Sequence, residues 1–490
     1  MKDDVFSSFE SPEFKELLKK YEEMMHQHTS AYFDSDELTS IAEYYANKEM
    51  MAESDKAIEY ALQLHPDDTD AMLFRCSNLI TEGRYDEAEM LLDAFPDADD
   101  NEALFLRGTI MVERRMAGEA ESIFSRLADR EEEDDKTGLL LDIGETYLNA
   151  GYRKHAYKWL KKAYRLSPAD YRVWESMGMY YLNAGNLDKY IYYMNRLLDE
   201  DPYEITYWTN LARAYLEQGY VEKASEAIDF AATVDSESPI VTELKGFLSL
   251  QTGDTERARE LFMQIEHSHP SRQHIWRALS ECYFTERNYG KALEYLDKVI
   301  ASTEIPSRRA DLFQRKAVCC LLADNLELCK QSIDEGLKCD GRFAQLYVTT
   351  AEYYIHLEQM QKAREAFRKA EELASDKGDF IEETAELLFR YSLTDEALGY
   401  FQRMEKEYPE RIKKYYYHLA YCYYMRKDTN NGINALIAGI IYQPDLLRHA
   451  DQNGLSSLMT PDFIKSGLAI KRMIDNGTLE ILEEPDDLNE

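Results

Sequence analysis

Residues 137–170 read TGLLLDIGETYLNAGYRKHAYKWLKKAYRLSPAD, and residues 171–204 read YRVWESMGMYYLNAGNLDKYIYYMNRLLDEDPYE. The two segments align without a gap, and two further segments continue the same spacing of 34 residues to residue 272. With small shifts the register extends to twelve units, which begin near Ser35, Thr69, Asn101, Thr137, Tyr171, Ile205, Pro239, Gln273, Ala310, Ala344, Gly378 and Lys413. A fixed period of this length predicts an array of helical hairpins.

The eighth place of each unit, counted from its first residue, always holds a small residue. These residues are Ala42, Cys76, Gly108, Gly144, Gly178, Ala212, Gly246, Ser280, Ala317, Ala351, Ala385 and Ala420. A larger side chain where two antiparallel helices cross would force their backbones apart. The twentieth place, on the second helix, also holds small residues, with Tyr190 as the exception.

Large and helix-breaking residues keep the same register. Aromatic residues recur in the fourth, eleventh and twenty-fourth places, for example Trp174, Tyr147 and Phe262. Six of the 12 prolines occupy the thirty-second place, where proline ends one helix before the next begins. Units two, three and eight depart locally, at Pro96, in the acidic run 130–136, and around Ile305 and Pro306, where kinks could form.

This pattern resembles the tetratricopeptide repeat family over roughly residues 35–446. The resemblance implies an all-α fold, a right-handed α-solenoid of about twelve helical hairpins. We expect an N-terminal capping helix in 1–34, C-terminal capping helices in 447–482 and a disordered acidic tail in 483–490. The caps are predicted from N-cap and proline signals at Ser11 with Pro12 and at Thr460 with Pro461. Apolar residues at helical spacing follow each signal: Phe14, Leu17, Leu18, Tyr21 and Met25, and Phe463, Ile464, Leu468 and Ile474.

The composition limits the partners. The formal net charge is -36, from 93 acidic and 57 basic side chains, and such a chain repels nucleic acids and anionic membranes. The sequence MKDDVFSSFE at the start lacks the features of a signal peptide, and no apolar stretch has the length of a membrane span. With seven scattered cysteines, we expect a reduced, cytoplasmic protein.

By resemblance, the second, fifth, ninth and thirteenth places of each first helix line a concave groove. The predicted partner-binding residues there are Glu43, Asn47, Glu145, Asn149, Asn183, Arg213, Glu217, Glu281, Glu352 and Glu386. Amides can hydrogen-bond an extended peptide backbone, and carboxylates attract Lys and Arg. We therefore expect a protein or peptide partner of basic or polar character. The alternative is a merely solvated groove.

Two other surfaces are open to two interpretations. A basic patch of Arg153, Lys154, Lys158, Lys161, Lys162 and Arg165 could dock an acidic partner or the acidic run of this chain, or could be a solvated outer face. Tyrosines around 190–193 and 415–424 could form a contact surface or pack between helices. Self-association of the chain also stays open.

Signatures of catalysis and ligand binding are missing. The sequence has no phosphate-binding loop, GxGxxG, HExxH, GxSxG or paired CxxC motif, so we expect no enzyme activity, cofactor or metal. Cys319, Cys320, Cys329 and Cys339 fit small buried core residues better than metal ligands. His26 and His28 lie on different sides of a helix, which weakens a shared ligand role.

The carboxylate clamp of chaperone-binding family members is also disfavoured. That clamp uses Lys, Asn and Arg at set places of three consecutive units. At the corresponding places from the first unit and from the fifth unit, only Asn210 agrees, whereas Thr39 and Glu175, for example, do not. The sequence therefore predicts a non-enzymatic scaffold or adaptor that binds a protein along the groove. The alternatives are a regulatory or peptide-sensing subunit that changes curvature, or an assembly factor or co-chaperone of a larger complex.

Overall fold

A computed structural model describes residues 9, 11–27, 29–48, 50–131, 133–269, 271–303, 305–446, 459–476 and 478, without the side chains of residues 133–135 and 307. Within these residues every regular element is a helix, and the helices pair into hairpins. The predicted all-α solenoid is confirmed. No described helix is long and apolar enough to span a lipid bilayer.

The chain forms two compact units, Met1–Leu244 and Lys245–Glu490. In the first unit, a single helix α2 (Pro12–Gln27) precedes the hairpins. The hairpins are α3 (Ser35–Asn47) with α4 (Met51–Leu64), α5 (Thr69–Thr81) with α6 (Tyr85–Asp93), α7 (Asn101–Glu113) with α8 (Ala117–Arg130), α9 (Glu133–Asn149) with α10 (Arg153–Leu166), α11 (Tyr171–Asn183) with α12 (Leu187–Glu200), and α13 (Ile205–Glu217) with α14 (Val221–Val234).

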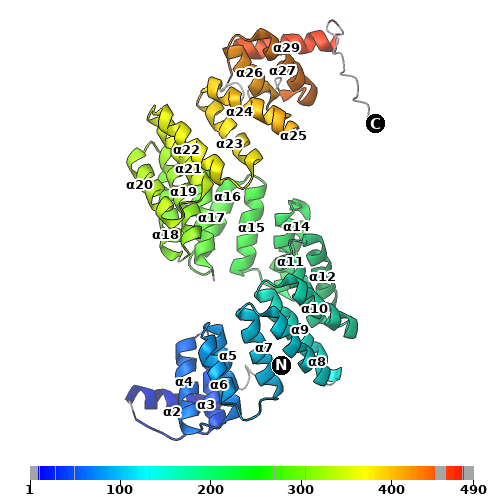
Figure 1. Ribbon diagram of the computed structural model, residues 1–490, viewed down its shortest axis with the longest axis vertical. Helices are drawn as coiled ribbons and strands as arrows, with labels where there is room; N and C mark the ends of the chain where they lie inside the picture. Colours follow the sequence, from blue (N-terminus) through cyan, green and yellow to red (C-terminus); the bar gives the residue numbers. More distant parts are fainter. Residues whose placement is uncertain are drawn as a thin grey trace. The chain divides into compact units, whose positions relative to one another are not determined.

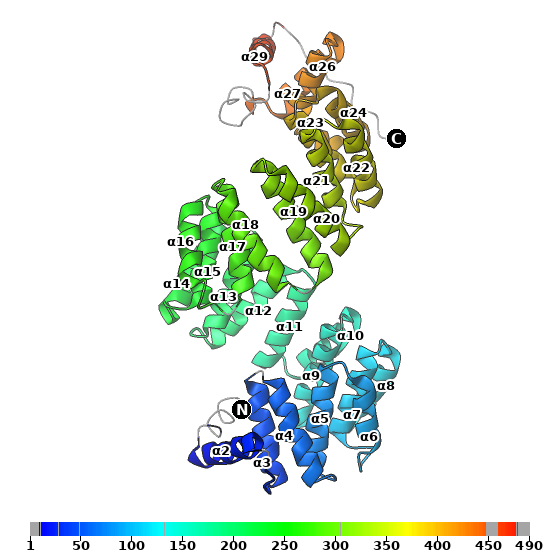
Figure 2. The same ribbon diagram turned by 90° about the vertical axis from the view of Figure 1, so that its left-hand side faces the viewer.

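Helix α15 (Pro239–Gln251) contains the division between the units, and the remaining helices belong to the second unit. They are α16 (Thr255–Ile265), α17 (Arg272–Thr285) with α18 (Tyr289–Ser302), α19 (Pro306–Leu322) with α20 (Leu326–Cys339), α21 (Ala344–His356) with α22 (Met360–Leu373), α23 (Lys377–Arg390) with α24 (Thr394–Glu407), the short α25 (Pro409–Ile412), α26 (Tyr416–Met425) with α27 (Thr429–Tyr442), and α29 (Pro461–Asp475). Figures 1 and 2 both show consecutive hairpins side by side, for example α17 with α18 next to α19 with α20.

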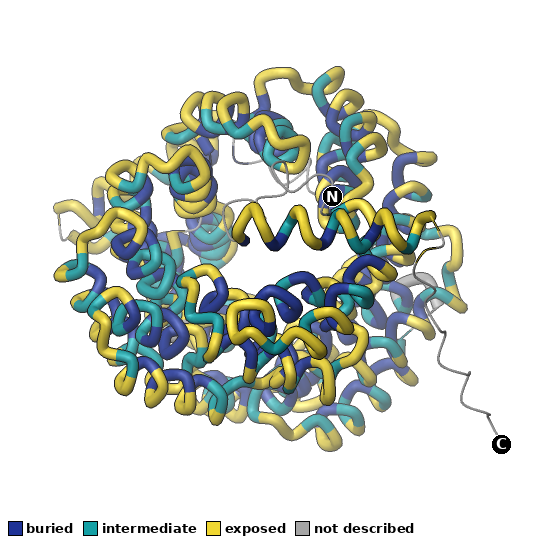
Figure 3. Tube along the Cα trace, turned by 90° about the horizontal axis from the view of Figure 1, so that it is seen from above, coloured by how far each residue is buried: buried dark blue, intermediate teal, exposed yellow. Residues whose placement is uncertain are grey.

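The helices are amphipathic. The eighth and twenty-fourth places determine how closely the two helices of a hairpin pack. Figure 3 shows buried and exposed residues alternating along the helices. A Cβ atom built on Gly246, in an eighth place, would lie 2.6 Å from the ring of Phe262, in the twenty-fourth place of the same unit. Gly144 stands in the same relation to Leu160. The small residues predicted from the register are therefore small because a buried side chain from the second helix occupies the adjacent space.

Tyr190, the exception in the twentieth place, is accommodated by the glycine opposite. Its side chain is buried, and a Cβ on Gly178 would lie 3.7 Å from the Tyr190 ring and 3.0 Å from Met194. Burial raises the pKa of the Tyr190 hydroxyl to about 12. A large residue in the twentieth place is thus tolerated where the eighth place has no side chain.

The fifteenth place of every unit but the first has a left-handed backbone, which the sequence analysis did not predict. Five units have glycine there, with φ between 72° and 83°, and the other six have Arg115, Arg287, Asp324, Glu358, Ser392 and Lys427, with φ between 55° and 67°. The place lies outside the described residues in the first unit. Around Gly151 and Glu358 alike, two backbone N–H groups bond back to carbonyls of the preceding first helix, a Schellman motif. This turn gives the chain its reversal into the second helix.

We expect this turn to respond in opposite directions to two substitutions. Gly151→Ala should lower the free energy of unfolding by about 1 kcal/mol, because a side chain disfavours a positive φ. Glu358→Gly should raise it by about 0.5 to 1 kcal/mol for the same reason. A Cβ on Gly151 would have no neighbour within 4 Å, so crowding does not contribute to the expected loss. Urea unfolding followed by circular dichroism measures both, and effects of the same sign would contradict the assignment.

The departures from strict register appear mainly as changes in helix length. First helices α9 and α19 have 17 residues where most first helices have 13. Both begin four residues before the first place of their units, at Glu133 and Pro306. Helix α6 has only 9 residues and ends before Pro96. The irregular units thus gain or lose about one helical turn.

The predicted capping signals are present in the described ends. The Ser11 hydroxyl accepts a bond from the Phe14 N–H (3.1 Å), and Thr460 accepts one from Phe463 (3.4 Å). Along α2 the packed face includes Met24, which is 5% exposed, and not the predicted Met25, which is 37% exposed. Helix α29 packs on the last core cluster through Phe463, Ile464, Leu468 and Ile474. The domain boundaries stay predictions, and residues 447–458, His28 and the tail 483–490 lie outside the described residues.

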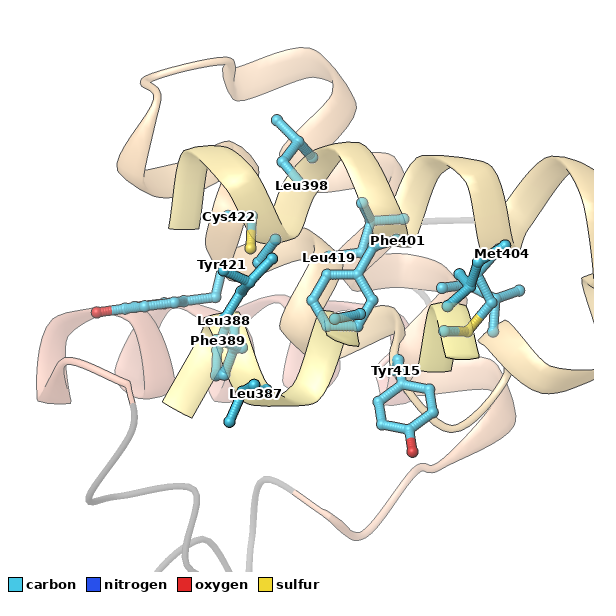
Figure 4. Packing of buried hydrophobic residues seen from close by; sticks show 14 of the residues in the cluster. Leu387, Leu388, Phe389, Leu398, Phe401, Met404, Tyr415, Leu419, Tyr421 and Cys422 are labelled. Carbon is cyan, nitrogen blue, oxygen red and sulfur yellow. The ribbon is translucent and has the colours of Figure 1, made fainter. Parts of the chain in front are cut away.

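His418 is half-buried in the aromatic core of the second unit, and its Nδ1 atom is fully buried. Its ring lies 4.7 Å from that of Phe389, 5.5 Å from Tyr415 and 6.1 Å from Phe401 between centroids. Figure 4 shows buried hydrophobic residues of this core, among them Phe389, Phe401 and Tyr415. The Nδ1 atom has no hydrogen-bond partner within the described residues, and burial lowers the pKa of His418 to about 4 from 6.5.

Acid should therefore destabilise the second unit through His418. Between pH 6.5 and 4 the unfolded chain binds a proton that the folded chain does not, so stability falls as the pH falls through this window. The loss should reach at most about 3 kcal/mol and should level off below pH 4. Urea unfolding at a series of pH values should show a shallower acid loss in His418→Phe than in the wild type. Equal slopes would mean that His418 titrates normally.

Candidate functional site

Four of the predicted partner-binding residues, three amides and one carboxylate, lie at the ends of first helices and are called the amide row. Asn47, Asn149, Asn183 and Glu217 are the last residues of α3, α9, α11 and α13, and all four are exposed. The left-handed turn two residues later ends the helix in each unit where the structure describes it. The carboxyl end of a helix carries a partial negative charge from its free carbonyls, so these positions favour an approaching cation.

The row positions differ in how freely their side chains can bind a partner. Arg153 donates a hydrogen bond from Nε to the Asn183 amide oxygen (3.0 Å), so this amide keeps its N–H₂ group for a ligand. In the described part of the chain, Asn149 and Glu217 make no side-chain hydrogen bond or ion pair. Both are therefore open to a partner without loss of an internal contact.

Most of the predicted ninth-place carboxylates already bind the following unit. Their partners are Ser176 Oγ for Glu145 (2.5 Å), Arg315 Nη1 for Glu281 (3.1 Å), the Tyr391 hydroxyl for Glu352 (2.9 Å) and the Tyr415 hydroxyl for Glu386. These contacts join one first helix, or the residue beside it, to the next. The carboxylates thus stabilise the stacking of units, and they are less available to attract a cation than the sequence suggested.

Glu43 and Arg213 are not among the ninth-place carboxylates that bind the following unit. Glu43 is half-buried, and its burial raises its pKa. Arg213 places Nη2 3.1 Å from Glu243 Oε2, and the Glu243 side chain is only 1% exposed. A buried carboxylate needs a nearby positive charge, which Arg213 supplies. Arg213 therefore has a structural role beside any contact with a partner.

The basic patch lies on α10, and all six of its side chains are exposed. Lys158 pairs with Glu121 on α8, and the Lys162 ammonium lies 3.7 Å from the centroid of the Trp159 ring. Burial lowers the pKa of Lys162, and the nearby charge of Lys158 lowers it further. Docking of the acidic run 130–136 on this patch cannot be followed, because the side chains of residues 132–135 lie outside the description.

The tyrosine clusters are mostly core. Tyr190, Tyr193, Tyr415, Tyr417, Tyr421 and Tyr423 are buried. Tyr192 and Tyr424 are the exposed members, at 55% and 43%. Among the predicted core cysteines, Cys319, Cys320 and Cys329 are buried, and no group of metal-binding side chains occurs within the described residues.

Sequence reasoning missed a buried ion cluster between the first two hairpins. The Arg75 side chain on α5 is 7% exposed, pairs with Asp55 on α4, and places Nη2 2.9 Å from Glu59. Asn78 also donates to Asp55 (3.0 Å). Burial alone would raise the pKa of Asp55, but hydrogen bonds with Glu82, Arg75 and Asn78 hold it below its usual value. A basic residue on a face that is otherwise apolar was the signal in the sequence.

Comparisons with known proteins give the following similarities. Family models of the tetratricopeptide repeat match residues 138–170, 205–237, 248–306 and 344–377. A tetratricopeptide repeat protein from Parabacteroides merdae ATCC 43184 is 16% identical, with a TM-score of 0.41 over 59% of this chain and 98% of that one. The APC/C hetero-tetramer Cut9-Hcn1 is 12% identical, with a TM-score of 0.40 over 91% of this chain and 98% of that one. Yeast Tom70 is 15% identical, with a TM-score of 0.39 over 83% of this chain and 96% of that one. No curated protein matches the chain in sequence.

Proposed function

Because this chain is a tetratricopeptide repeat protein, we propose that it is a non-enzymatic scaffold or adaptor that binds an extended, basic or polar segment of another protein along its first helices. The repeat is in general a protein-interaction fold. The observation that carries the proposal is the row of exposed amides and carboxylates at the ends of α3, α9, α11 and α13.

The charge and geometry of this row favour a basic segment. Each side chain stands where the free carbonyls of a helix end already disfavour an anion. Glu217 adds a full negative charge, and the chain as a whole has a net charge of -36. The amides of Asn47 and Asn149 can donate to and accept from a peptide backbone, which gives binding without dependence on one side-chain sequence. We also propose that the protein is cytoplasmic, because its seven cysteines have no disulfide-like spacing.

We expect partner binding to depend on the row and not on the second helices. Asn149→Ala with Glu217→Ala should weaken binding about tenfold, because two hydrogen-bonding groups are lost at about 0.5 to 1.5 kcal/mol each. Asn195→Ala with Glu226→Ala is the matched control, since it removes one amide and one carboxylate from exposed places on α12 and α14. Proteins captured from native lysate on the wild-type chain are identified first, and their affinities for both double variants are then measured by calorimetry.

The character of the partner is tested in the same titration. The bound segment, mapped by peptide truncation, should carry Lys or Arg, and its affinity should fall as salt rises. An acidic segment, or equal affinities for the row variant and the matched control, would sink the proposal.

A further inference from the structure

A cleft of about 550 Å³, lined by polar and apolar side chains, opens between the first helices α17 and α19 in the second unit. Its wall on one side is the start of α17, with Ser271, Gln273, His274 and Arg277, and on the other the start of α19. Val299 and Thr303, at the end of α18, form its floor together with Leu312. Figures 1 and 2 show α17, α18 and α19 next to one another. The volume is that of an ordinary ligand pocket.

Guanidinium groups dominate the charge of this cleft. Arg277 and Arg308 line it, and among the lining residues that the structure describes Asp311 is the acidic one. Arg277 places Nη2 3.2 Å from Asp311, which also lies 3.5 Å from Arg315 Nε. Arg308 is exposed and makes no ion pair within the described part of the chain. The described lining residues of this cleft therefore carry more positive than negative charge, in a chain with a net charge of -36.

The backbone and the neutral side chains around the cleft strengthen this preference. The cleft lies at the N-terminal ends of α17 and α19, where free N–H groups carry partial positive charge, and beside the C-terminal end of α18, whose free carbonyls partly offset it. Gln273 donates from Nε2 to Thr303 Oγ1 (2.5 Å), which fixes the side chain at the rim. Val299 and Leu312 are buried below the arginines, and charge-assisted hydrogen bonds from a guanidinium are stronger than neutral ones.

We propose that the cleft between α17 and α19 is a binding site for an oxyanion, a phosphate or carboxylate group of a ligand, held by Arg277 and Arg308. The planar guanidinium matches either group with paired hydrogen bonds. Asp311 occupies Arg277 in the absence of the anion, and the incoming oxyanion competes with it for that guanidinium.

This site is separate from the amide row, and it differs from the carboxylate clamp of chaperone-binding family members although Arg277 stands in the fifth place of its unit. The ninth place of the α17 unit is Glu281, which pairs with Arg315, and Arg308 precedes the first place of the next unit. The amide row used in the proposed function belongs to the first unit of the chain, Met1–Leu244. Loss of one site therefore leaves the other intact, and failure of either proposal can be told from failure of the other.

The test is calorimetry on the full chain with two probes, inorganic phosphate and succinate, at an ionic strength held constant with chloride. We expect saturable binding of at least one probe at millimolar concentrations. Arg308→Gln should weaken it at least about tenfold, since it removes a charged hydrogen-bond donor. Asp311→Asn should tighten it several-fold, because the competing carboxylate is gone. Arg257→Gln, an exposed arginine of α16 that pairs with Glu260, is the matched control and should bind as the wild type does.

The two probes separate the sources of the anion: tighter phosphate binding assigns a phosphate-bearing ligand, and tighter succinate binding assigns a carboxylate. Circular dichroism of each variant shows that it is folded. The proposal is overturned if neither probe binds the wild type, if Arg308→Gln binds like Arg257→Gln, or if Asp311→Asn weakens binding. Because Asp311→Asn is expected to gain affinity, a general loss of structure cannot imitate the expected result.

Discussion

Phe262→Ala should lower the free energy of unfolding of the second unit by about 4 kcal/mol, within the range for a buried aromatic side chain. Phe262 is 0% exposed, and its ring fills the space beside Gly246 and lies 5.1 Å from the ring of Phe247. Truncation leaves a cavity where two helices of a hairpin cross. Urea unfolding measures the loss, and hydrogen exchange of α15 to α18 locates it, because neighbouring repeats stabilise one another locally.

A second substitution tests whether the volume lost at Phe262 causes the loss of stability. Gly246→Val alone should cost about 1 to 3 kcal/mol, because its side chain would collide with the Phe262 ring. Added to Phe262→Ala, the same valine should recover part of the lost stability by filling the cavity. The control is Gly399→Ala on α24, where a Cβ has no neighbour within 4 Å, and this change should stabilise by about 0.5 to 1 kcal/mol. Additive losses in the double variant would refute the complementarity of the eighth and twenty-fourth places.

Asp55→Ala should cost about 3 to 5 kcal/mol, since it leaves the buried Arg75 guanidinium without its closest counterion. The Asp55 side chain is 16% exposed and that of Arg75 is 7% exposed. Replacing both, as Asp55→Leu with Arg75→Met, should be less destabilising than Asp55→Ala, because no charge remains buried. Urea unfolding of both variants gives the comparison.

An exposed ion pair supplies the control for this cluster. Glu335 and Lys338 pair at 2.6 Å, with side chains 52% and 70% exposed. Glu335→Ala should change stability by less than about 0.5 kcal/mol. A similar loss from Glu335→Ala and Asp55→Ala would show that burial does not determine the value of the Arg75 cluster.

The register was predictable because it depends on contacts within one hairpin. The eighth and twenty-fourth places, such as Gly246 and Phe262, are only 16 residues apart, so their volumes must match in every unit. The left-handed fifteenth place was hidden because residues such as Arg115 and Glu358 occupy it in six units, where glycine would have signalled the turn.

The functional surface was less predictable because it depends on contacts between hairpins. The sequence shows that Glu352 is acidic, but it does not show that the Tyr391 hydroxyl donates a hydrogen bond to it. That bond depends on how the two units pack. The same holds for Arg153, which binds Asn183 of the following unit. The sequence could therefore place residues on the first helices, but it could not say which of them are free to bind a partner.

Site-specific photocrosslinking tests the central claim, that the first helices hold a protein partner, most directly. A photoreactive phenylalanine analogue is introduced at Asn149, at the end of α9, and in a second variant at Asn195, an exposed place on α12. Both variants are irradiated in native lysate, and the crosslinked peptides are sequenced. We expect the Asn149 probe to capture one recurring, basic segment and the Asn195 probe to capture none. Capture of a recurring segment at Asn195 and none at Asn149 would contradict the account.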